Sequence, residues 1–218
     1  MKLANQDQVA ALDPQFGRMA TEVGMHAWSL PQLTMREKAF VFLAADLCTA
    51  NVGFPLLTHV QMAGANGVSV PECVAAIRHL APYAGYPTAA VALQQLRQLD
   101  QSDGSQPEPL HGCDLNTATI AALAALDEEF AGFFANQFNQ RWGTAELSPR
   151  ERALACIAAD VLNQTLDESF SLHIDLAVAA GAGDEQVRAV LLLVAEYGVA
   201  KAWRAYRALT LYLPGAAE

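Results

Sequence analysis

The sequence predicts an all-α protein built from two tandem repeats of one helical unit. Ala10-Ala11-Leu12-Asp13 recurs as Ala124-Ala125-Leu126-Asp127, an offset of 124 − 10 = 114 residues. The same offset, without a gap, relates further pairs: Trp28 and Trp142, Arg36-Glu37 and Arg150-Glu151, Asp46 and Asp160, His59 and His173, and Tyr83 and Tyr197. Alanine dominates the apolar residues, which favours closely packed helices, and no Val/Ile/Thr alternation is long enough to predict a strand. Such a long period indicates two fused copies of one unit.

The first two helices of each repeat have recognisable limits. Apolar residues at helical spacing predict a helix over 9–25. Thr34 and Glu37 form a T-x-x-E capping box, which predicts the start of a second helix that runs to about residue 49. In the second repeat Ser148 and Glu151 form the same box with Pro149 at the first helical position, and this helix is expected to end near residue 163.

The later helices are bounded by glycine and proline. A third helix is predicted over 54–66 and 167–180, each followed by a glycine that can close it in the left-handed conformation. The fourth begins near residues 69 and 183. Pro82, Gly85 and Pro87 should break it in the first repeat, whereas the second repeat can remain straighter over 195–201. Last helices are expected to end near 99 and 213.

These elements predict two domains of similar size. Residues 1–100 form the first repeat and 117–218 the second, more divergent one. The stretch between them, 101–116, is rich in proline and polar residues and is expected to be a linker that lets the halves pack side by side.

Composition and charge exclude several classes of partner. The net charge of −10 disfavours nucleic acid, and no apolar run reaches the roughly 18 residues needed to cross a bilayer. The polar start contains no signal-peptide core, so a cytoplasmic location is expected. Only 17% of the 218 residues are charged, which favours a surface partly buried in a homo-oligomer.

The sequence predicts neither a metal site nor a cofactor. The four cysteines, at 48, 73, 113 and 156, form no Cys-x-x-Cys pair and are expected to be free buried thiols. No glycine-rich phosphate loop, G-x-S-x-G or H-E-x-x-H motif is present.

The repeated polar residues are the candidate site. His59 and His173 lie in apolar surroundings, so each is either a core histidine or a general acid/base. Glu37 and Glu151 are explained by helix capping, but Arg36 and Arg150 oppose the helix dipole and need a partner, either an aspartate such as Asp46 or Asp160 or a ligand carboxylate. Tyr83 and Tyr197 fit core packing with a polar edge, while Tyr86 lies at the predicted helix break.

These residues together resemble the carboxymuconolactone decarboxylase family, which also includes alkylhydroperoxidase-like proteins. The resemblance rests on Leu33-Thr-Met-Arg36-Glu37, His59, Gly67 and Tyr83-Ala84-Gly85-Tyr86-Pro87, and in the second repeat on Arg150-Glu151, His173, Gly181 and Tyr197. It implies a helical bundle in which the tandem chain is a fused pseudo-dimer and three chains form a ring.

The resemblance implies a cofactor-free reaction on a small carboxylated lactone or cyclic enol. It assigns acid/base chemistry to His59, with Glu37, His173 and Tyr86 as further catalytic candidates. Substrate contacts are expected from Arg36, Arg150, Glu151, Tyr83 and Tyr197. Thiol peroxidase activity is not expected, because the Cys-x-x-Cys positions hold Val52 and Pro55, and Leu166 and Ser169. A non-catalytic ligand-binding or scaffold protein remains the alternative.

Overall fold

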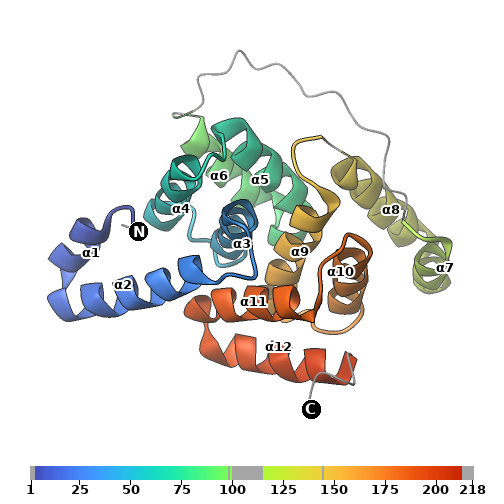
Figure 1. Ribbon diagram of the computed structural model, residues 1–218. Helices are drawn as coiled ribbons and strands as arrows, with labels where there is room; N and C mark the ends of the chain where they lie inside the picture. The colour runs from blue at the N-terminus through green and yellow to red at the C-terminus, as the bar shows by residue number, and fades with distance from the viewer. Residues whose placement is uncertain (1–2, 98, 100–114, 144, 213–218) are drawn as a thin grey trace.

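The fold is entirely helical in the part of the chain that the structure describes, as predicted. A computed structural model describes residues 3–97, 99, 115–143 and 145–212, and within them it contains twelve α-helices, one 3-10 helix and no strand (Figure 1). The helices of the first repeat are α1 (Gln6–Leu12), α2 (Pro14–Ser29), α3 (Met35–Cys48), α4 (Phe54–Ala65), α5 (Val70–Ala84) and α6 (Tyr86–Leu96). Those of the second are α7 (Thr117–Leu126), α8 (Glu128–Trp142), α9 (Pro149–Asn163), α10 (Glu168–Ala179), α11 (Asp184–Val194), η1 (Ala195–Tyr197) and α12 (Val199–Tyr212).

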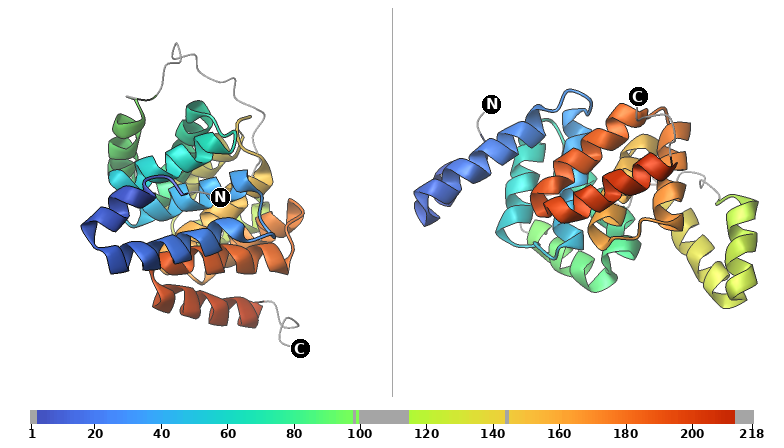
Figure 2. Two further views of the ribbon diagram at one scale, coloured as in Figure 1. Left: turned by 60° about the vertical axis from the view of Figure 1, so that its left-hand side comes forward. Right: turned by 90° about the horizontal axis from the view of Figure 1, so that it is seen from below.

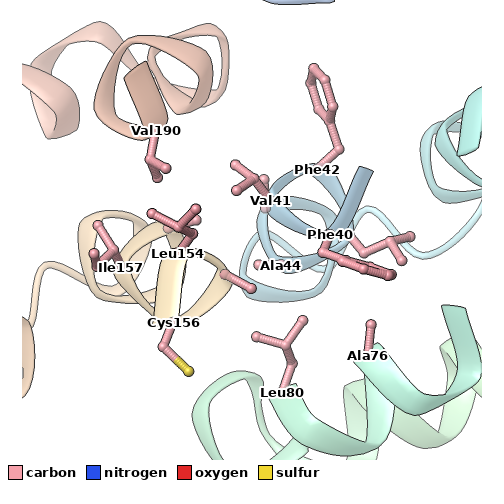
Figure 3. Packing of buried hydrophobic residues seen from close by; sticks show 14 of the residues in the cluster. Phe40, Val41, Phe42, Ala44, Ala76, Leu80, Leu154, Cys156, Ile157 and Val190 are labelled. Atoms are coloured by element: carbon pink, nitrogen blue, oxygen red, sulfur yellow. The ribbon is translucent and has the colours of Figure 1, made fainter. Parts of the chain in front are cut away.

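Helices α3 and α9 pack against each other at the centre of the molecule. Both are buried on all sides, as a helix enclosed within a bundle is: every residue from Glu37 to Leu47 and from Arg152 to Leu162 is buried. Figure 3 shows side chains from the two central helices interleaved with Leu80 of α5 and Val190 of α11. The two repeats therefore share one core.

Each repeat sends one helix across to the other. Helix α5 of the first repeat packs on α9 as well as on α3, and α11 of the second packs on α3 as well as on α9. This exchange matters for the site, because it carries the C-terminal end of α5 and the segment after α11 toward the other repeat.

The predicted helix starts and stops are confirmed where two sequence rules agree. Thr34 and Ser148 each close a complete capping box, with the backbone N–H groups of Glu37 and Glu151 donating to the hydroxyls. Gly67 and Gly181, just after α4 and α10, have φ angles of 82° and 84°, a region that glycine enters without a Cβ clash.

Two element predictions are wrong. The single helix over 9–25 is two helices, because Asp13 is extended (φ −159°) and caps α2 with Pro14 at its first position. The second prediction concerns residues 195–201, which are not straighter than their counterparts. Helix α11 passes into η1, and the helix is then interrupted at Gly198 (φ 156°), as it is at Gly85 (φ 92°) in the first repeat.

The α1–α2 and α7–α8 hairpins are two arms that extend from opposite sides of the bundle (Figures 1 and 2). They occupy equivalent places in the two repeats. Their outer surfaces carry exposed apolar side chains at equivalent positions: Leu12 and Leu126, Phe16 and Phe130, and Met19 and Phe133. The arms thus present similar apolar faces to whatever surrounds the bundle.

The predicted linker falls mostly outside the described residues, which resume at Leu115. Leu115 is buried and Asn116 caps α7, so the last two residues of the predicted linker belong to the fold. Within the described residues, no helix is both long and apolar enough to cross a membrane.

Candidate functional site

A histidine–aspartate pair links α3 and α4 of the first repeat. Asp46, fully buried on α3, accepts a hydrogen bond at Oδ2 from Nδ1 of His59 on α4, over 2.7 Å. A buried carboxylate on Nδ1 places the proton of the neutral ring there and stabilises the imidazolium when the ring takes a second proton. The far nitrogen, Nε2, is then the atom available for chemistry.

Aromatic rings hold the His59 imidazole in place. Phe42, one helical turn before Asp46, stacks on the imidazole with ring centroids 4.4 Å apart and planes 15° from parallel. Trp28 of α2 stacks on Phe42 at 4.9 Å. The ring is therefore fixed by packing on its face and by a hydrogen bond at its edge, which is the kind of pre-organisation that a proton-transfer group needs.

The second repeat completes this site. The hydroxyl of Tyr197, on η1, donates to Oδ1 of Asp46 over 2.9 Å and lies 3.4 Å from Nδ1 of His59. Burial, together with the nearby charge of Asp46, raises the pKa of Tyr197 well above its ordinary value, so the hydroxyl stays a donor. Asp46, His59 and Tyr197 come from three helical segments and both repeats.

In an equivalent second cluster, the histidine and aspartate come from the second repeat and the tyrosine comes from the first. His173 Nδ1 bonds Oδ2 of Asp160 over 2.6 Å, and Tyr83 of the first repeat brings its hydroxyl to 3.4 Å from His173 Nε2. Asp160 Oδ1 also accepts hydrogen bonds from the hydroxyls of Thr165 and Ser169. Ser169, which stands at one of the missing cysteine positions, therefore supports the aspartate.

The two histidines differ in access. The His59 side chain is 15% exposed and its Nε2 has no hydrogen-bond partner among the described residues, whereas the His173 side chain is 2% exposed with Tyr83 facing its Nε2. Neither of the two cavities that we describe, one along α1–α2 and one between α5, α6 and α8, is lined by either histidine. Of the two, only His59 presents a free nitrogen toward solvent.

A thiol and a third histidine lie beside the second cluster, where His79 packs against Tyr83. Cys156 stands where the first repeat has Phe42, and its Sγ lies 3.2 Å from Nε2 of the buried His79. Burial lowers the pKa of His79 to about 3 and raises that of Cys156 well above its ordinary value. Both groups are therefore neutral near pH 7, and the second cluster is closed by uncharged side chains.

The predicted arginines and glutamates form a different structure. Arg36 Nε donates to Glu151 over 2.9 Å and Arg150 Nε donates to Glu37 over 2.6 Å, so two reciprocal ion pairs join α3 to α9. Arg36 also binds Glu72. The expectation of an aspartate partner for these arginines, Asp46 or Asp160, is wrong, since both aspartates bind histidines and glutamates pair with the arginines.

Tyr86 forms hydrogen bonds with α8 and with neither histidine cluster. Its hydroxyl accepts a hydrogen bond from Arg141 over 3.0 Å and donates to Gln137, both on α8. The structure thus brings His59 to Tyr197 and His173 to Tyr83, but places Arg36 with Glu151, Arg150 with Glu37, and Tyr86 with Arg141. The substrate contacts predicted for Arg36, Arg150 and Glu151 stay predictions, as do the catalytic roles predicted for Glu37 and Tyr86.

Sequence reasoning did not assign the groups that flank the histidines. Asp46 and Asp160 carried a usable signal, because each recurs 13 residues before its histidine at the repeat offset. Glu196 had none, since Pro82 occupies its counterpart. Burial of its carboxyl, with Asp46 nearby, raises the pKa of Glu196 to about 7, although the residue as a whole is exposed.

The described residues contain no cluster of three or more His, Cys, Asp or Glu side chains that could hold a metal ion. Cys48, Cys73 and Cys156 are free thiols. Burial raises the pKa of Cys48 to about 12 and that of Cys156 well above its ordinary value, so neither thiol offers a ready thiolate for peroxidase chemistry.

The protein is thus a fused pair of helical repeats, each with a histidine bonded to a buried aspartate and a tyrosine from the other repeat nearby. The model of the carboxymuconolactone decarboxylase family matches residues 14–98 and again residues 127–211. The chain therefore belongs to the carboxymuconolactone decarboxylase family, as two tandem members.

One solved structure has a similar fold. It is described as "a putative gamma-carboxymuconolactone decarboxylase subunit" from Burkholderia xenovorans LB400, and it is 21% identical with a TM-score of 0.55 over 94% of this chain and 88% of that one. No curated protein gives a significant match.

Proposed function

We propose that this protein is a cofactor-independent lyase or isomerase that acts on a small carboxylated lactone or cyclic enol, with His59 as the general acid/base. The observation that carries this proposal is the hydrogen bond between Nδ1 of His59 and the buried Asp46, together with a free Nε2 at a partly exposed edge. Membership of the carboxymuconolactone decarboxylase family supports the reaction class.

In the decarboxylase form, the bond between a ring carbon and its carboxylate breaks and CO2 leaves. The electron pair remains on the substrate and spreads into the conjugated lactone. The imidazolium of His59 then delivers its Nε2 proton to carbon, and the neutral ring recovers a proton from water. One proton is consumed for each CO2 released. Asp46 stabilises the charged ring throughout, and Tyr197 holds the aspartate.

In the isomerase form, neutral His59 removes a proton from one carbon and returns it to another, so no atom is lost. The same geometry serves both reactions, because the proton passes through Nε2 in each. The His173 cluster, closed by Tyr83, is proposed to be structural. The predicted catalytic roles of Glu37, His173 and Tyr86 have no contact that links them to His59 among the described residues.

We also propose that the protein works as a homo-oligomer, a trimer of two-repeat chains, in the cytoplasm. The exposed apolar faces of the two arms support the assembly, and the free thiols of Cys48, Cys73 and Cys156 suit a reducing compartment. A second chain across the exposed edge of His59 would supply the pocket wall that neither described cavity provides.

The test is turnover of a carboxylated muconolactone, followed by ultraviolet absorbance and by CO2 release, for the wild type and His59→Gln. General acid/base catalysis predicts a loss of about 10²–10⁴-fold. His26→Gln is the matched control, because His26 is an exposed histidine on α2. Full activity in His59→Gln would show that the histidine assignment is wrong.

The second candidate function is a non-catalytic binding or scaffold protein. The packing of His59 between Phe42 and the Asp46 carboxylate favours it, because the same contacts would stabilise a core histidine. This function predicts no turnover of any lactone or enol by the wild type, no stabilisation by these compounds in a thermal-shift assay, and a sharp fall in melting temperature for His59→Gln.

A further inference from the structure

A second polar site lies between α5, α6 and α8, where the first repeat meets the arm of the second. A cavity of about 290 Å³ opens there. Its apolar lining, called the floor below, is Ala81, Ala89, Ala90 and Leu93, and its polar lining, called the wall, is Arg78, Tyr86 and Arg141. Small-molecule sites usually combine an apolar lining with a few converging polar groups, and this cavity has that composition on a small scale.

The two arginines of this wall have no carboxylate partner in the part of the chain that the structure describes. Among the described residues, neither Arg78 nor Arg141 forms an ion pair. Arg141 donates only to neutral groups, the amide oxygen of Gln140 and the hydroxyl of Tyr86. Arg36, Arg150 and Arg188 by contrast each bind a carboxylate of the chain. In a protein of net charge −10, two guanidinium groups on one cavity, with no ion pair to any described residue, are a local positive site.

Tyr86 sets the position of Arg141. The Tyr86 hydroxyl donates to Gln137 and accepts from Arg141 Nη2, so α6 and α8 are joined across the cavity. Both Gln137 and Arg141 lie on α8, one turn apart, and the tyrosine is placed by the chain reversal at Gly85. The guanidinium is thus held before any ligand arrives, which lowers the entropy cost of binding.

We propose that this cavity binds a small organic carboxylate with a short apolar tail. The planar forks of two arginines suit a carboxylate group, and the alanine and leucine floor accepts the tail. The volume excludes a large ligand. The site is separate from the His59 cluster, since it is lined by neither His59 nor His173, and the proposal does not depend on the proposed reaction.

The experiment is isothermal titration calorimetry of the full-length chain with sodium hexanoate at constant ionic strength. Hexanoate should bind saturably with one site per chain, and hexan-1-ol, which has the same tail without the charge, should not. Arg78→Gln should weaken hexanoate binding by about tenfold, the effect of losing one charged hydrogen bond. Because Arg78 bonds no described residue, this variant should keep the wild-type melting temperature.

Further variants and a second ligand test which residues form the site and which class of ligand it binds. Arg141→Gln should also weaken binding, whereas Arg204→Gln, on the exposed surface of α12, and His59→Gln should leave it unchanged. Inorganic phosphate should bind more weakly than hexanoate because it cannot use the apolar floor. The proposal is overturned if hexanoate does not bind, if hexanoate binding is lost in His59→Gln but kept in Arg78→Gln, or if phosphate binds as tightly.

Discussion

At the residue scale, the two histidine clusters differ in a few side chains around a shared aspartate–histidine pair. Phe42 stacks on His59, while the equivalent Cys156 meets His79 instead. Tyr197 donates a hydrogen bond to Asp46, whereas the Tyr83 hydroxyl lies beside Nε2 of His173. Gene fusion allows such divergence, because each half can change without changing the other. One cluster stays open to solvent, and the other becomes part of the core.

Asp46→Asn should reduce turnover while leaving the fold intact. The amide keeps the size of the carboxylate and its acceptor for Tyr197, but it no longer stabilises a charged His59 and does not fix the proton on Nδ1. By analogy with a buried aspartate behind a catalytic histidine, the loss is about 10²–10⁴-fold in kcat. Steady-state kinetics, with circular dichroism to check folding, measures it.

Asp160→Asn is the matched control for that variant. Asp160 accepts from Thr165, Ser169 and His173 in a closed cluster, so the substitution should lower the melting temperature but leave turnover unchanged. Equal losses of turnover in the two variants would mean that both clusters work, or that neither role is catalytic.

His79 gives the protein a specific dependence of stability on pH. Burial lowers its pKa to about 3 in the folded state, while in the unfolded chain it is about 6.5. The unfolded state therefore binds more protons below pH 6.5, and folding stability falls as the pH decreases. One such group costs about 2 kcal/mol between pH 7 and pH 5.

Urea unfolding at pH 7 and pH 5 measures this effect by comparison of the wild type with His79→Gln. The free energy of unfolding should fall by about 2 kcal/mol more in the wild type than in the variant, because glutamine does not titrate. Identical pH dependence in the two proteins would show that folding does not lower the pKa of His79.

At the scale of elements, the reciprocal ion pairs tie the N-termini of α3 and α9 together. Each glutamate accepts its own capping-box N–H at one oxygen and an arginine of the other repeat at the other oxygen. The carboxylates also lie where the helix dipole favours negative charge. Local helix capping and the contact between repeats therefore depend on the same two side chains.

Arg150→Ala should destabilise the protein by about 1–3 kcal/mol in urea unfolding, since it leaves the buried Glu37 without its charge partner. Arg150 also donates to the carbonyl of Gly181. Arg188→Ala is the control: it removes a partly buried i,i+4 pair with Asp184 within one helix, worth about 0.3–0.5 kcal/mol. A similar small loss for both would mean that the pairs between the repeats add nothing beyond surface charge.

The helices with strong local signals could be predicted, and the contacts between repeats could not. Capping boxes at Thr34 and Ser148 act within four residues, so sequence spacing suffices to find them. The break at Asp13 was missed because the apolar spacing continues through it, and that at Gly198 because no proline marks it. The pairing of Arg36 with Glu151 depends on how α3 and α9 cross, which no local pattern encodes.

For the site, too, the repeated residues could be predicted from the sequence and the contacts between repeats could not. Repetition at a fixed offset identified His59 and His173 without any structure, and their tyrosine neighbours with them. It did not reveal that each tyrosine crosses to the other repeat, because that depends on α5 and α11 packing across the shared core. Glu196 and His79 have no repeat counterpart of their own kind, so only their burial in the folded chain distinguishes them.

At the scale of the whole molecule, the chain is a pseudo-dimer whose two arms remain largely uncovered. Phe16 is 55% exposed and Phe130 48%, at equivalent positions on α2 and α8. Exposed apolar side chains repeated on two equivalent arms are typical of an interface with further copies. A closed ring would use both arms of every chain, one on each side of the bundle (Figure 2).

Sedimentation velocity at micromolar concentration should therefore give a species of three chains, each of 23.3 kDa. Phe16→Glu with Phe130→Glu should shift it toward the single chain, because two charges per chain would be buried in apolar contacts. Gln15→Glu adds one such charge to an exposed polar position beside Phe16 and should leave the mass unchanged. If the ring also covers His59, the double variant loses turnover as it dissociates. A wild type that sediments as one chain, or a double variant that stays trimeric, would contradict the assembly through the arms.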